Sequence, residues 1–356
     1  MRPATSHDVA RLAGVSQPTV SRALRDDPRV SRDTIARVRA AAASLGYVPS
    51  SRGRSLSTRA TGQVAVVVGE LDNPFYMEAL EHLYGRLEAD GLRLVALTDP
   101  PERSSLTVER LLDGAVDGAI VMTTLLGSDL PGQLAARGLP TVLLNRAIDD
   151  ELVDTVECDN RQGAGLAAAE LLALGHREIA AIFGPATTST GRDREAAFRE
   201  VLAAGGVPLA EARIRRGPFT HEFGRQALGE LLAGAPADAR RGDGAARAAG
   251  AGSAAARPTA VFCANDVLAI GALNGAKGAG VAVPEQLTVV GFDDIGMAAW
   301  ELYDLSTVRQ PLAEMAATAV RLLSERIADP SLSPRRQRLP AELVRRGSHR
   351  AAPAAR

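Results

Sequence analysis

The chain has 356 residues, of which 46% are hydrophobic and 23% are charged, and its formal net charge is −1. That length is too great for a single small binding module, and it suffices for a small domain followed by two domains with cores of their own. Residues 1–60 hold 11 arginines and only 4 acidic residues, whereas the remainder is acidic. A basic head on an acidic body predicts that only the head meets a polyanion such as nucleic acid.

The cysteines, histidines and apolar runs argue against several classes of protein. Cys158 and Cys263 have neither a partner at CxxC spacing nor metal-ligand spacing, so a reduced, cytoplasmic setting is expected rather than a disulfide scaffold. The five histidines are dispersed, so no metal site is expected. The N-terminus lacks the apolar core of a signal peptide and the longest apolar runs are strand-sized, so we expect neither secretion nor a membrane span.

Residues 5–24 predict two short helices joined by a tight turn. Thr5 can cap the first helix with Asp8 as its capping-box partner. Ser16 can cap the second helix, which accepts Pro18 in its first turn because the first N–H groups of a helix have no intrahelical acceptor. A helix-turn-helix of this kind places the N-terminal half of its second helix against base edges in the DNA major groove. The side chains expected there are Gln17, Pro18, Thr19 and Arg22.

The rest of the head supplies a small core and a linker. The first helix has an apolar side made by Val9, Ala10, Leu12 and Ala13, and Gly14 can end it. Ser31 can cap a third helix, whose apolar side is expected to carry Ile35, Val38, Ala42 and Leu45. Residues 50–60 are rich in serine and arginine, and composition alone favours a solvated linker.

The segments DVARLAGVSQPTVSRAL and VSRDTIARVRAAAASLGYVPSSRGRSL closely resemble the DNA-binding head and hinge of the lactose-repressor family of bacterial transcription regulators. The resemblance implies a head at residues 1–49 and, at residues 50–60, a hinge helix in which Leu56 wedges between base pairs in the minor groove, with Arg54 before it. Gly53 stands where the family usually has alanine, and Pro18 where it commonly has a polar side chain. The residues implied to bind DNA are Thr5, Ser16, Gln17, Pro18, Thr19, Ser21, Arg22, Arg54 and Leu56.

From residue 62 onward, strand-like runs alternate with helical patterns. The strand-like runs are residues 64–68, 92–97, 119–122, 141–144, 179–183, 260–263 and 287–292. Repeated β-α units predict parallel sheets covered by helices on both faces, and some 280 residues favour two such lobes. This α/β body resembles the periplasmic sugar-binding-protein fold that the family carries behind its head.

The resemblance gives an effector-binding and dimerisation domain at residues 61–356. We expect an N-lobe of about residues 61–160 and 293–322, and a C-lobe of about residues 161–292 and 323–346. Residues 234–257 are low in complexity and nearly free of large apolar groups, so we expect a flexible insertion that is unrelated to ligand binding.

Ligands of open α/β sheets bind beyond the carboxyl ends of the strands. That rule selects polar residues that follow the predicted strands, but an Asn or Asp in this position usually caps the next helix. For Asn73, Asn160 and Asp266 capping is the favoured interpretation. Taken together, the carboxylate, amide and guanidinium groups suit the hydroxyls of a sugar. The aromatic residues Phe75, Tyr76, Phe219 and Trp300, all expected in loops, suit either the faces of a sugar ring or a place in the core.

The family resemblance narrows this set to the residues implied to hold an effector. They are Asn73, Phe75, Tyr76, Asp99, Asn145, Arg146, Arg194, Phe219, Asn265, Asp293 and Gln310. The sugar binders often have Asp at position 145, so Asn145 changes the pattern of hydroxyl contacts. Arg192 is either a neighbour of the site or a solvated charge at a helix start.

The sequence does not favour catalysis, because it has no nucleophile elbow and no glycine loop between a strand and a helix start. GAKGAG, at residues 275–280, is interpreted as a helix end. We therefore expect a homodimeric regulator, most simply a repressor, that binds a pseudo-palindromic DNA operator and a small carbohydrate, without catalytic residues, metal or cofactor. The alternatives are a purine or phosphosugar effector, a solute-binding protein and a sugar-modifying enzyme.

Overall fold

The computed structural model describes residues 4–47, 60–69, 71–98, 104–234 and 256–353. Contacts divide the chain into two compact units, a head of Met1–Thr61 and a body of Gly62–Arg356. The predicted hinge residues Arg54 and Leu56, the effector residue Asp99 and most of the expected insertion lie outside the described residues. No helix in the described ranges is both long and apolar enough to cross a membrane.

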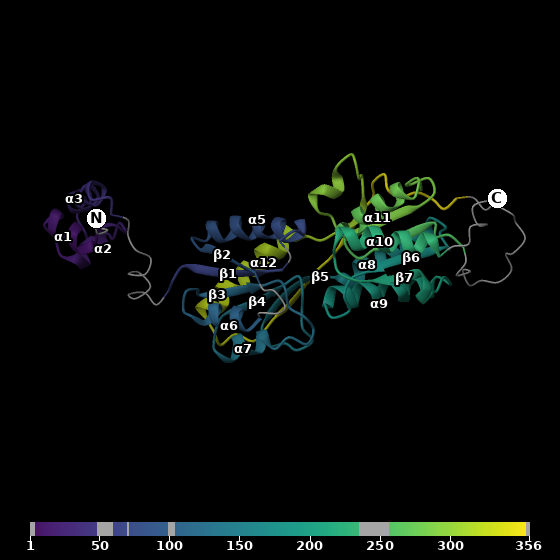
Figure 1. Cartoon of the computed structure of the whole chain (residues 1–356). Helices are drawn as coiled ribbons and strands as arrows, with labels where there is room; N and C mark the ends of the chain where they lie inside the picture. The colour runs from purple at the N-terminus through teal and green to yellow at the C-terminus, as the bar shows by residue number, and fades with distance from the viewer. Residues whose placement is uncertain (1–3, 48–59, 70, 99–103, 235–255, 354–356) are drawn as a thin grey trace, which may run out of the picture. The chain divides into compact units, whose positions relative to one another are not determined.

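The head is a three-helix unit made of α1 (Ser6–Ala13), α2 (Gln17–Ala23) and α3 (Arg32–Ser44) (Figure 1). The predicted capping box is present, because the Thr5 hydroxyl accepts from the Asp8 N–H and the Asp8 carboxylate accepts from the Thr5 N–H. Gly14 ends α1 with a φ of 67°, and the Ser31 hydroxyl caps α3. Ser16 occupies the N-cap position of α2, but its hydroxyl bonds the Thr19 hydroxyl instead of a backbone N–H.

The core of the head is smaller than predicted. Val9, Val20, Ala23 and Val38 are at its centre, but Leu12 is 57% exposed and Leu45 is 37% exposed. Because successive helical residues are turned by about 100°, Leu12 lies well to one side of the stripe formed by Val9, Ala10 and Ala13.

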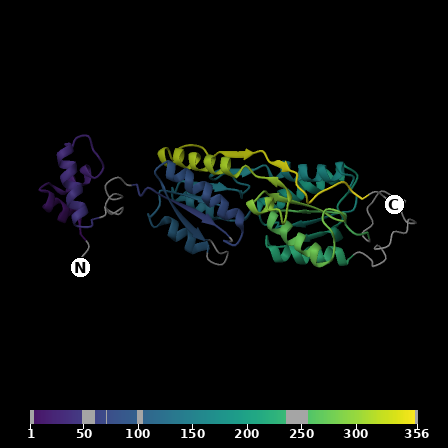
Figure 2. The ribbon, with the colours of Figure 1, turned by 90° about the horizontal axis from the view of Figure 1, so that it is seen from above.

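The body contains two six-stranded sheets. The N-lobe sheet has the order β11-β5-β4-β3-β1-β2 and is parallel throughout. Its strands are β1 (Gln63–Val68), β2 (Arg93–Thr98), β3 (Gly118–Val121), β4 (Thr141–Leu144), β5 (Asp154–Cys158) and β11 (Arg336–Leu339). The helices α5 (Pro74–Ala89) and α12 (Leu312–Ala328) pack side by side on one face of the sheet (Figure 2), and α6 (Ser104–Leu112) and α7 (Leu130–Ala136) cover the other.

The C-lobe sheet has the order β12-β10-β9-β8-β6-β7, and only β12 is antiparallel to its neighbour. Its strands are β6 (Ile179–Phe183), β7 (Ile214–Arg216), β8 (Ala260–Cys263), β9 (Thr288–Asp293), β10 (Ser306–Arg309) and β12 (Glu342–Val344). The helix α8 (Asn160–Ala173) packs on α9 (Ser189–Ala204), and α10 (His221–Ala233) packs on α11 (Asp266–Gly278). Short 3-10 turns lie at Glu211–Arg213, named η2, and at Gly296–Ala299, named η4.

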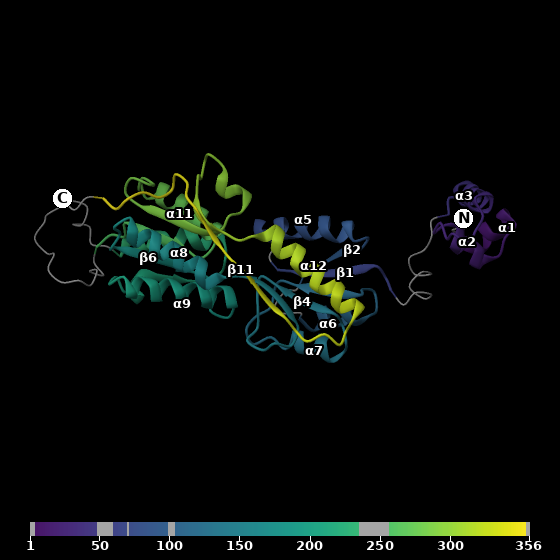
Figure 3. The same cartoon turned by 180° about the vertical axis from the view of Figure 1, so that it is seen from behind.

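The described chain crosses between the lobes after β5, after β10 and after β11 (Figure 3). The first crossing follows the end of β5 at Cys158. The predicted N-lobe segment 293–322 is wrong at its start, because β10 pairs with β9 in the C-lobe sheet. The predicted C-lobe segment 323–346 is wrong at its start too, because the end of α12 and the whole of β11 belong to the N-lobe.

Candidate functional site

The second helix of the head presents polar side chains opposite its buried face. Val20 and Ala23 are buried, whereas Pro18 and Arg22, four residues apart, are exposed. The guanidinium of Arg22 has no hydrogen bond or ion pair with any described residue, so it is available to a base edge or a phosphate.

The other predicted DNA-contacting residues of the head have bonds within the protein. Gln17 donates from Nε2 to the Ser6 hydroxyl at 3.4 Å, the Ser21 hydroxyl accepts from Arg25 at 3.1 Å, and Thr5 is held in its capping box. These bonds fix the rotamers of half-exposed side chains on the same surface of the head.

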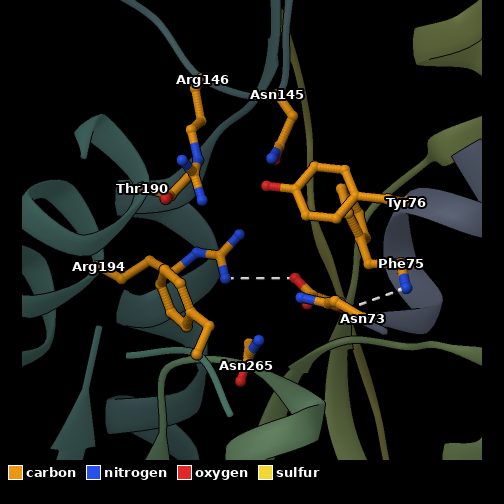
Figure 4. Close-up of a pocket in the computed structure, with 10 residues that line it drawn as sticks. Asn73, Phe75, Tyr76, Asn145, Arg146, Thr190, Arg194 and Asn265 are labelled. Carbon is orange, nitrogen blue, oxygen red and sulfur yellow. Dashed lines mark hydrogen bonds and ion pairs between the residues drawn. The ribbon is translucent and has the colours of Figure 1, made fainter. Parts of the chain in front are cut away.

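A cleft lies between the two lobes of the body, beyond the carboxyl ends of their strands. Its cavity measures only about 20 Å³, far below the roughly 300 Å³ of small-molecule sites, so a ligand of that size fits only when the lobes lie further apart. Its lining residues are Asn73, Phe75, Tyr76, Asn145, Arg146, Thr190, Arg194, Phe219, Asn265 and Asp293 (Figure 4). The structure thus brings together every predicted effector residue except Asp99 and Gln310.

Arg194 is the most enclosed charge of the cleft, with 2% of its surface exposed. Its Nε donates to Asn160 Oδ1 at 2.7 Å, and its terminal nitrogen donates to the Ala264 carbonyl at 2.6 Å and to Asp293 Oδ1 at 3.2 Å. The guanidinium carbon also lies 3.6 Å from the centre of the Phe292 ring. The C-lobe therefore holds this arginine in one position before any ligand arrives.

Asp293 is the carboxylate that faces Arg194. Burial raises the pKa of Asp293 to about 6, and the positive charge of Arg194 opposes that shift. Burial also lowers the pKa of Arg194, with Asp293 opposing. Gln310 does not line the cleft but donates from Nε2 to Asp293 Oδ1 at 2.7 Å, so it positions the carboxylate from behind.

The capping interpretation is right for only one of the three residues to which it was applied. Asn73 caps α5, with its Oδ1 accepting from the Phe75 N–H at 3.1 Å. Asn160 is not a cap, because Asp159 caps α8 and Asn160 holds Arg194. Asp266 is not a cap either, since Asn265 caps α11 while lining the cleft.

Asp266 lies fully buried behind the cleft. Its carboxylate accepts from the Ile295 N–H at 3.0 Å and from the Thr307 hydroxyl. Burial raises the pKa of Asp266 well above its ordinary value. Because it ties η4 to β10, we assign it a structural role.

Three of the four predicted aromatic residues lie in the cleft. The Phe75 and Tyr76 rings pack edge to face with centroids 5.7 Å apart, and both side chains belong to the first turn of α5 rather than to a loop. Phe219 stands over Gly184, where a Cβ atom would come within 2.0 Å of its ring. Trp300 is 55% exposed and stacks on Tyr303 outside the cleft.

On the N-lobe side several buried polar atoms have no partner among the described residues. They are Asn145 Oδ1, Arg146 Nε and the hydroxyls of Thr123 and Thr124. Among the described residues the Arg146 side chain has one acceptor, the Thr123 carbonyl, to which Nη1 donates at 3.5 Å. Asn145 has a φ of 71°, a conformation that costs a non-glycine residue roughly 1–3 kcal/mol and is common where function fixes a side chain.

Hydrogen bonds join the lobes around the rim of the cleft. The Leu126 N–H donates to the Thr187 carbonyl at 2.9 Å, and Arg192 donates to Asp149 at 2.8 Å. On another part of the rim, the Gly296 N–H donates to Glu78 Oε1 at 2.8 Å. Arg192 is therefore a bridge between the lobes, not a lining residue.

Thr190 was missed by the sequence analysis, although it lines the cleft from the first turn of α9. The rule of strand carboxyl ends would have found it, because β6 leads into α9. Within the described ranges, no group of His, Cys, Asp and Glu side chains is arranged to hold a metal ion.

Three family models match the chain. Residues 5–50 match "Bacterial regulatory proteins, lacI family", residues 61–257 match "Periplasmic binding proteins and sugar binding domain of LacI family", and residues 168–349 match "Periplasmic binding protein-like domain". The matches thus cover both the head and the body.

Characterised relatives match over nearly their whole length. The HTH-type transcriptional regulator CelR of Thermobifida fusca is 34% identical, with 98% of each chain covered. The ribose operon repressor of Escherichia coli K12 is 31% identical, covering 97% of this chain and 99% of the repressor.

A solved structure is similar at the level of the whole chain. The lac repressor dimer bound to operator and the anti-inducer ONPF has a TM-score of 0.82 and 26% identity, with 98% of this chain and 99% of the repressor chain covered. A complex of the regulator CelR with cellobiose has also been solved, with a TM-score of 0.70, 32% identity and 97% and 99% coverage.

Proposed function

The chain belongs to the LacI family of bacterial regulatory proteins, and we propose that it is a transcription repressor whose hold on operator DNA is controlled by a small carbohydrate. The family consists of DNA-binding regulators, not enzymes. Operator DNA lies in the bacterial cytoplasm, so the proposal puts the protein there.

One observation carries the proposal: the polar cleft is built from both lobes of the body. Asn73 and Asn145 reach it from the N-lobe, and Arg194, Asn265 and Asp293 reach it from the C-lobe. Amide, carboxylate and guanidinium groups beside aromatic faces suit a hydroxylated ring. Relatives solved with cellobiose and with ribose support a sugar as the effector.

The proposed coupling follows from the position of the cleft. The lobes can adopt a more open or a more closed angle, and a ligand held between them favours one of the two. The ligand changes DNA binding only if it binds the open and the closed form with different affinities. The hydrogen bonds Arg192–Asp149 and Glu78–Gly296 hold the lobes at one angle. The effector would have to change that angle to alter DNA binding.

Base reading is proposed for Gln17, Thr19 and Arg22 of α2, with Ser16, Ser21 and Thr5 nearer the DNA backbone. Pro18 has no N–H to donate, so the operator should differ from those of relatives at the base pair facing it. The proposed roles of Leu56 as a minor-groove wedge and of Arg54 as its neighbour fall on residues outside the described ranges.

A homodimer is proposed, because two-fold symmetry matches a pseudo-palindromic operator. Large apolar side chains are exposed on both lobes, at Leu71, Met77 and Tyr84 and at Trp300 and Leu302. Exposed apolar groups of this size are typical of protein interfaces.

Capture of genomic DNA fragments by the full-length protein, followed by footprinting, tests the DNA-binding part of the proposal. Arg22→Ala should weaken operator binding about tenfold to a hundredfold, as expected for loss of a bidentate base contact of roughly 1–3 kcal/mol. Arg137→Ala, an exposed change on α7's C-cap, serves as the matched control. Equal operator affinity of Arg22→Ala and the control would contradict the assignment of α2.

Leu56→Ala tests the hinge in the same footprint. We expect specific binding to fall while non-specific binding is kept, because a wedge acts only on the deformed operator. Unchanged specific binding would refute the wedge.

A further inference from the structure

We propose that the effector carries an anionic group, a carboxylate or a phosphate on a sugar, and that Arg146 is the residue that selects it. This inference rests on the proposed function and names the chemical class of its effector. It starts from the balance of charges in the cleft.

Among the described residues that line the cleft, two are cations and one is an anion. Arg194 is neutralised by Asp293 at 3.2 Å and has further acceptors in Asn160 and Ala264. The nearby carboxylate of Asp294 is paired with Arg309 and Arg346. Arg146 is therefore the cation of the cleft that no described carboxylate neutralises.

The side chain of Arg146 is partly buried in the cleft, where a ligand could bond it. Its Nε is buried and has no acceptor, and its single bond, to the Thr123 carbonyl, is long at 3.5 Å. A buried charged donor without an acceptor is costly, so such a group is normally paired. Figure 4 shows the guanidinium reaching from the N-lobe into the space that Thr190 and Arg194 enter from the other lobe.

The surroundings of Arg146 favour a negative charge as well. Thr190 belongs to the first turn of α9, a helix of 16 residues, and a helix N-terminus carries partial positive charge. The Thr190 hydroxyl donates to the Thr188 hydroxyl at 3.3 Å, a bond that it could exchange for a carboxylate or phosphate oxygen. Arginine binds such groups through two parallel bonds. A neutral sugar would supply acceptors for these donors but would leave the positive charge uncompensated.

The rest of the cleft fits the sugar part of the same molecule. The unpartnered Oδ1 of Asn145 can accept from a hydroxyl, and the side chains of Asn265 and Asp293 line the neighbouring wall.

The test measures the affinity of full-length protein for matched sets of ligands. Each set contains a neutral sugar, its sugar acid and its phosphate: glucose, glucuronate and glucose 6-phosphate; galactose, galacturonate and galactose 6-phosphate; ribose, ribonate and ribose 5-phosphate. We expect at least one anionic member to bind about tenfold to a hundredfold more tightly than its neutral parent, as charge-assisted bonds allow. The carboxylate and phosphate members distinguish the two sources of charge.

Variants assign that preference to one side chain. Arg146→Gln should remove the preference for the anionic member, Arg146→Lys should keep part of it, and the exposed control Arg137→Gln should leave it unchanged. Thermal unfolding of each variant without ligand checks that the body is folded.

Two outcomes overturn the inference: a neutral sugar that binds as tightly as its anionic partners, or a panel in which no anionic sugar binds. A preference for the anion that survives in Arg146→Gln overturns the role of that residue. Genomic DNA capture tests the proposed function separately, since operator binding with a neutral effector would refute the inference alone.

Discussion

The two walls of the cleft differ in how far their polar groups are satisfied. On the C-lobe wall Arg194 donates to both Asn160 and Asp293, and Gln310 supports Asp293 from behind. Of the buried side-chain nitrogens and oxygens of this group, only Gln310 Oε1 lacks a described partner. On the N-lobe wall Asn145 and Arg146 keep buried atoms without partners. The C-lobe wall therefore contributes to folding stability and orients its side chains, whereas the N-lobe wall keeps donors and acceptors that a ligand can bond.

The largest expected effect comes from Arg194→Met on the C-lobe wall. The change leaves the buried carboxylate of Asp293 without its counter-charge, which typically costs about 3–5 kcal/mol. Urea unfolding at pH 7 should show this loss. An unfolding free energy within about 0.5 kcal/mol of the wild type, the usual range for surface changes, would refute the distinction between the walls.

Asn160→Ala should have the next largest effect. It removes the acceptor of Arg194 Nε at 2.7 Å, and a buried donor left unpaired costs about 1–3 kcal/mol. The matched control is Asn274→Ala on α11, an exposed residue whose side chain bonds His221. Denaturant unfolding of the two variants side by side should place Asn160→Ala well below the control, and similar values would mean that Arg194 does not depend on Asn160.

The pH dependence of folding stability is a further property of the C-lobe wall, because it reports on Asp293. Burial raises the pKa of Asp293 to about 6 from an ordinary value of 3.8. The folded state therefore binds the proton of the Asp293 carboxyl more tightly than the unfolded state does. The free energy of unfolding decreases on this account as pH rises from about 4 through 6. Below about pH 4 the carboxyl is protonated in both states and the effect is absent.

Effector binding should show the opposite trend, because hydroxyl donors need the ionised carboxylate. We expect affinity to fall about tenfold per pH unit below 6, as measured by calorimetric titration. Asp293→Asn should flatten this profile. A wild-type profile that is flat between pH 5 and 7 would exclude Asp293 as an acceptor for the ligand.

The smallest effect is expected from Thr124→Val on the N-lobe. The Thr124 side chain is 2% exposed and its hydroxyl has no described partner, so an apolar group of the same shape should be neutral or stabilise the fold by up to about 1 kcal/mol. Thermal unfolding without ligand measures this, and a clear loss of stability would show that the hydroxyl is bonded after all.

The sequence predicted the strands that are apolar and missed those that carry charge. The runs at 141–144, 179–183 and 260–263 coincide with β4, β6 and β8. The strands β5 and β11 were missed because their sequences, DTVEC and RQRL, read as polar. Their charges are paired across the chain, with Asp154 held by Arg326 and Arg335 and Glu157 held by Arg336 and Arg338, which no local pattern reveals.

The candidate site was more predictable than those strands. Asn145, Asn265 and Asp293 lie at strand ends, where a general rule for α/β sheets looks for ligands. The roles of Asn160 and Gln310 were out of reach, because each depends on a partner 17 or more residues away in sequence. Local sequence marks where a site lies, and long-range contacts decide what each residue does there.

The order of chain crossings has a consequence for synthesis of the protein. The edge strand β11 and the helix α12 of the N-lobe come from residues 312–339, near the end of the chain. During synthesis on the ribosome the N-lobe sheet therefore cannot be completed until most of the chain has been made. Domains usually fold as each one emerges. A translation product that stops shortly before β11 would turn β5 and β10, which are interior strands of the finished sheets, into unpaired edges, a form prone to aggregate.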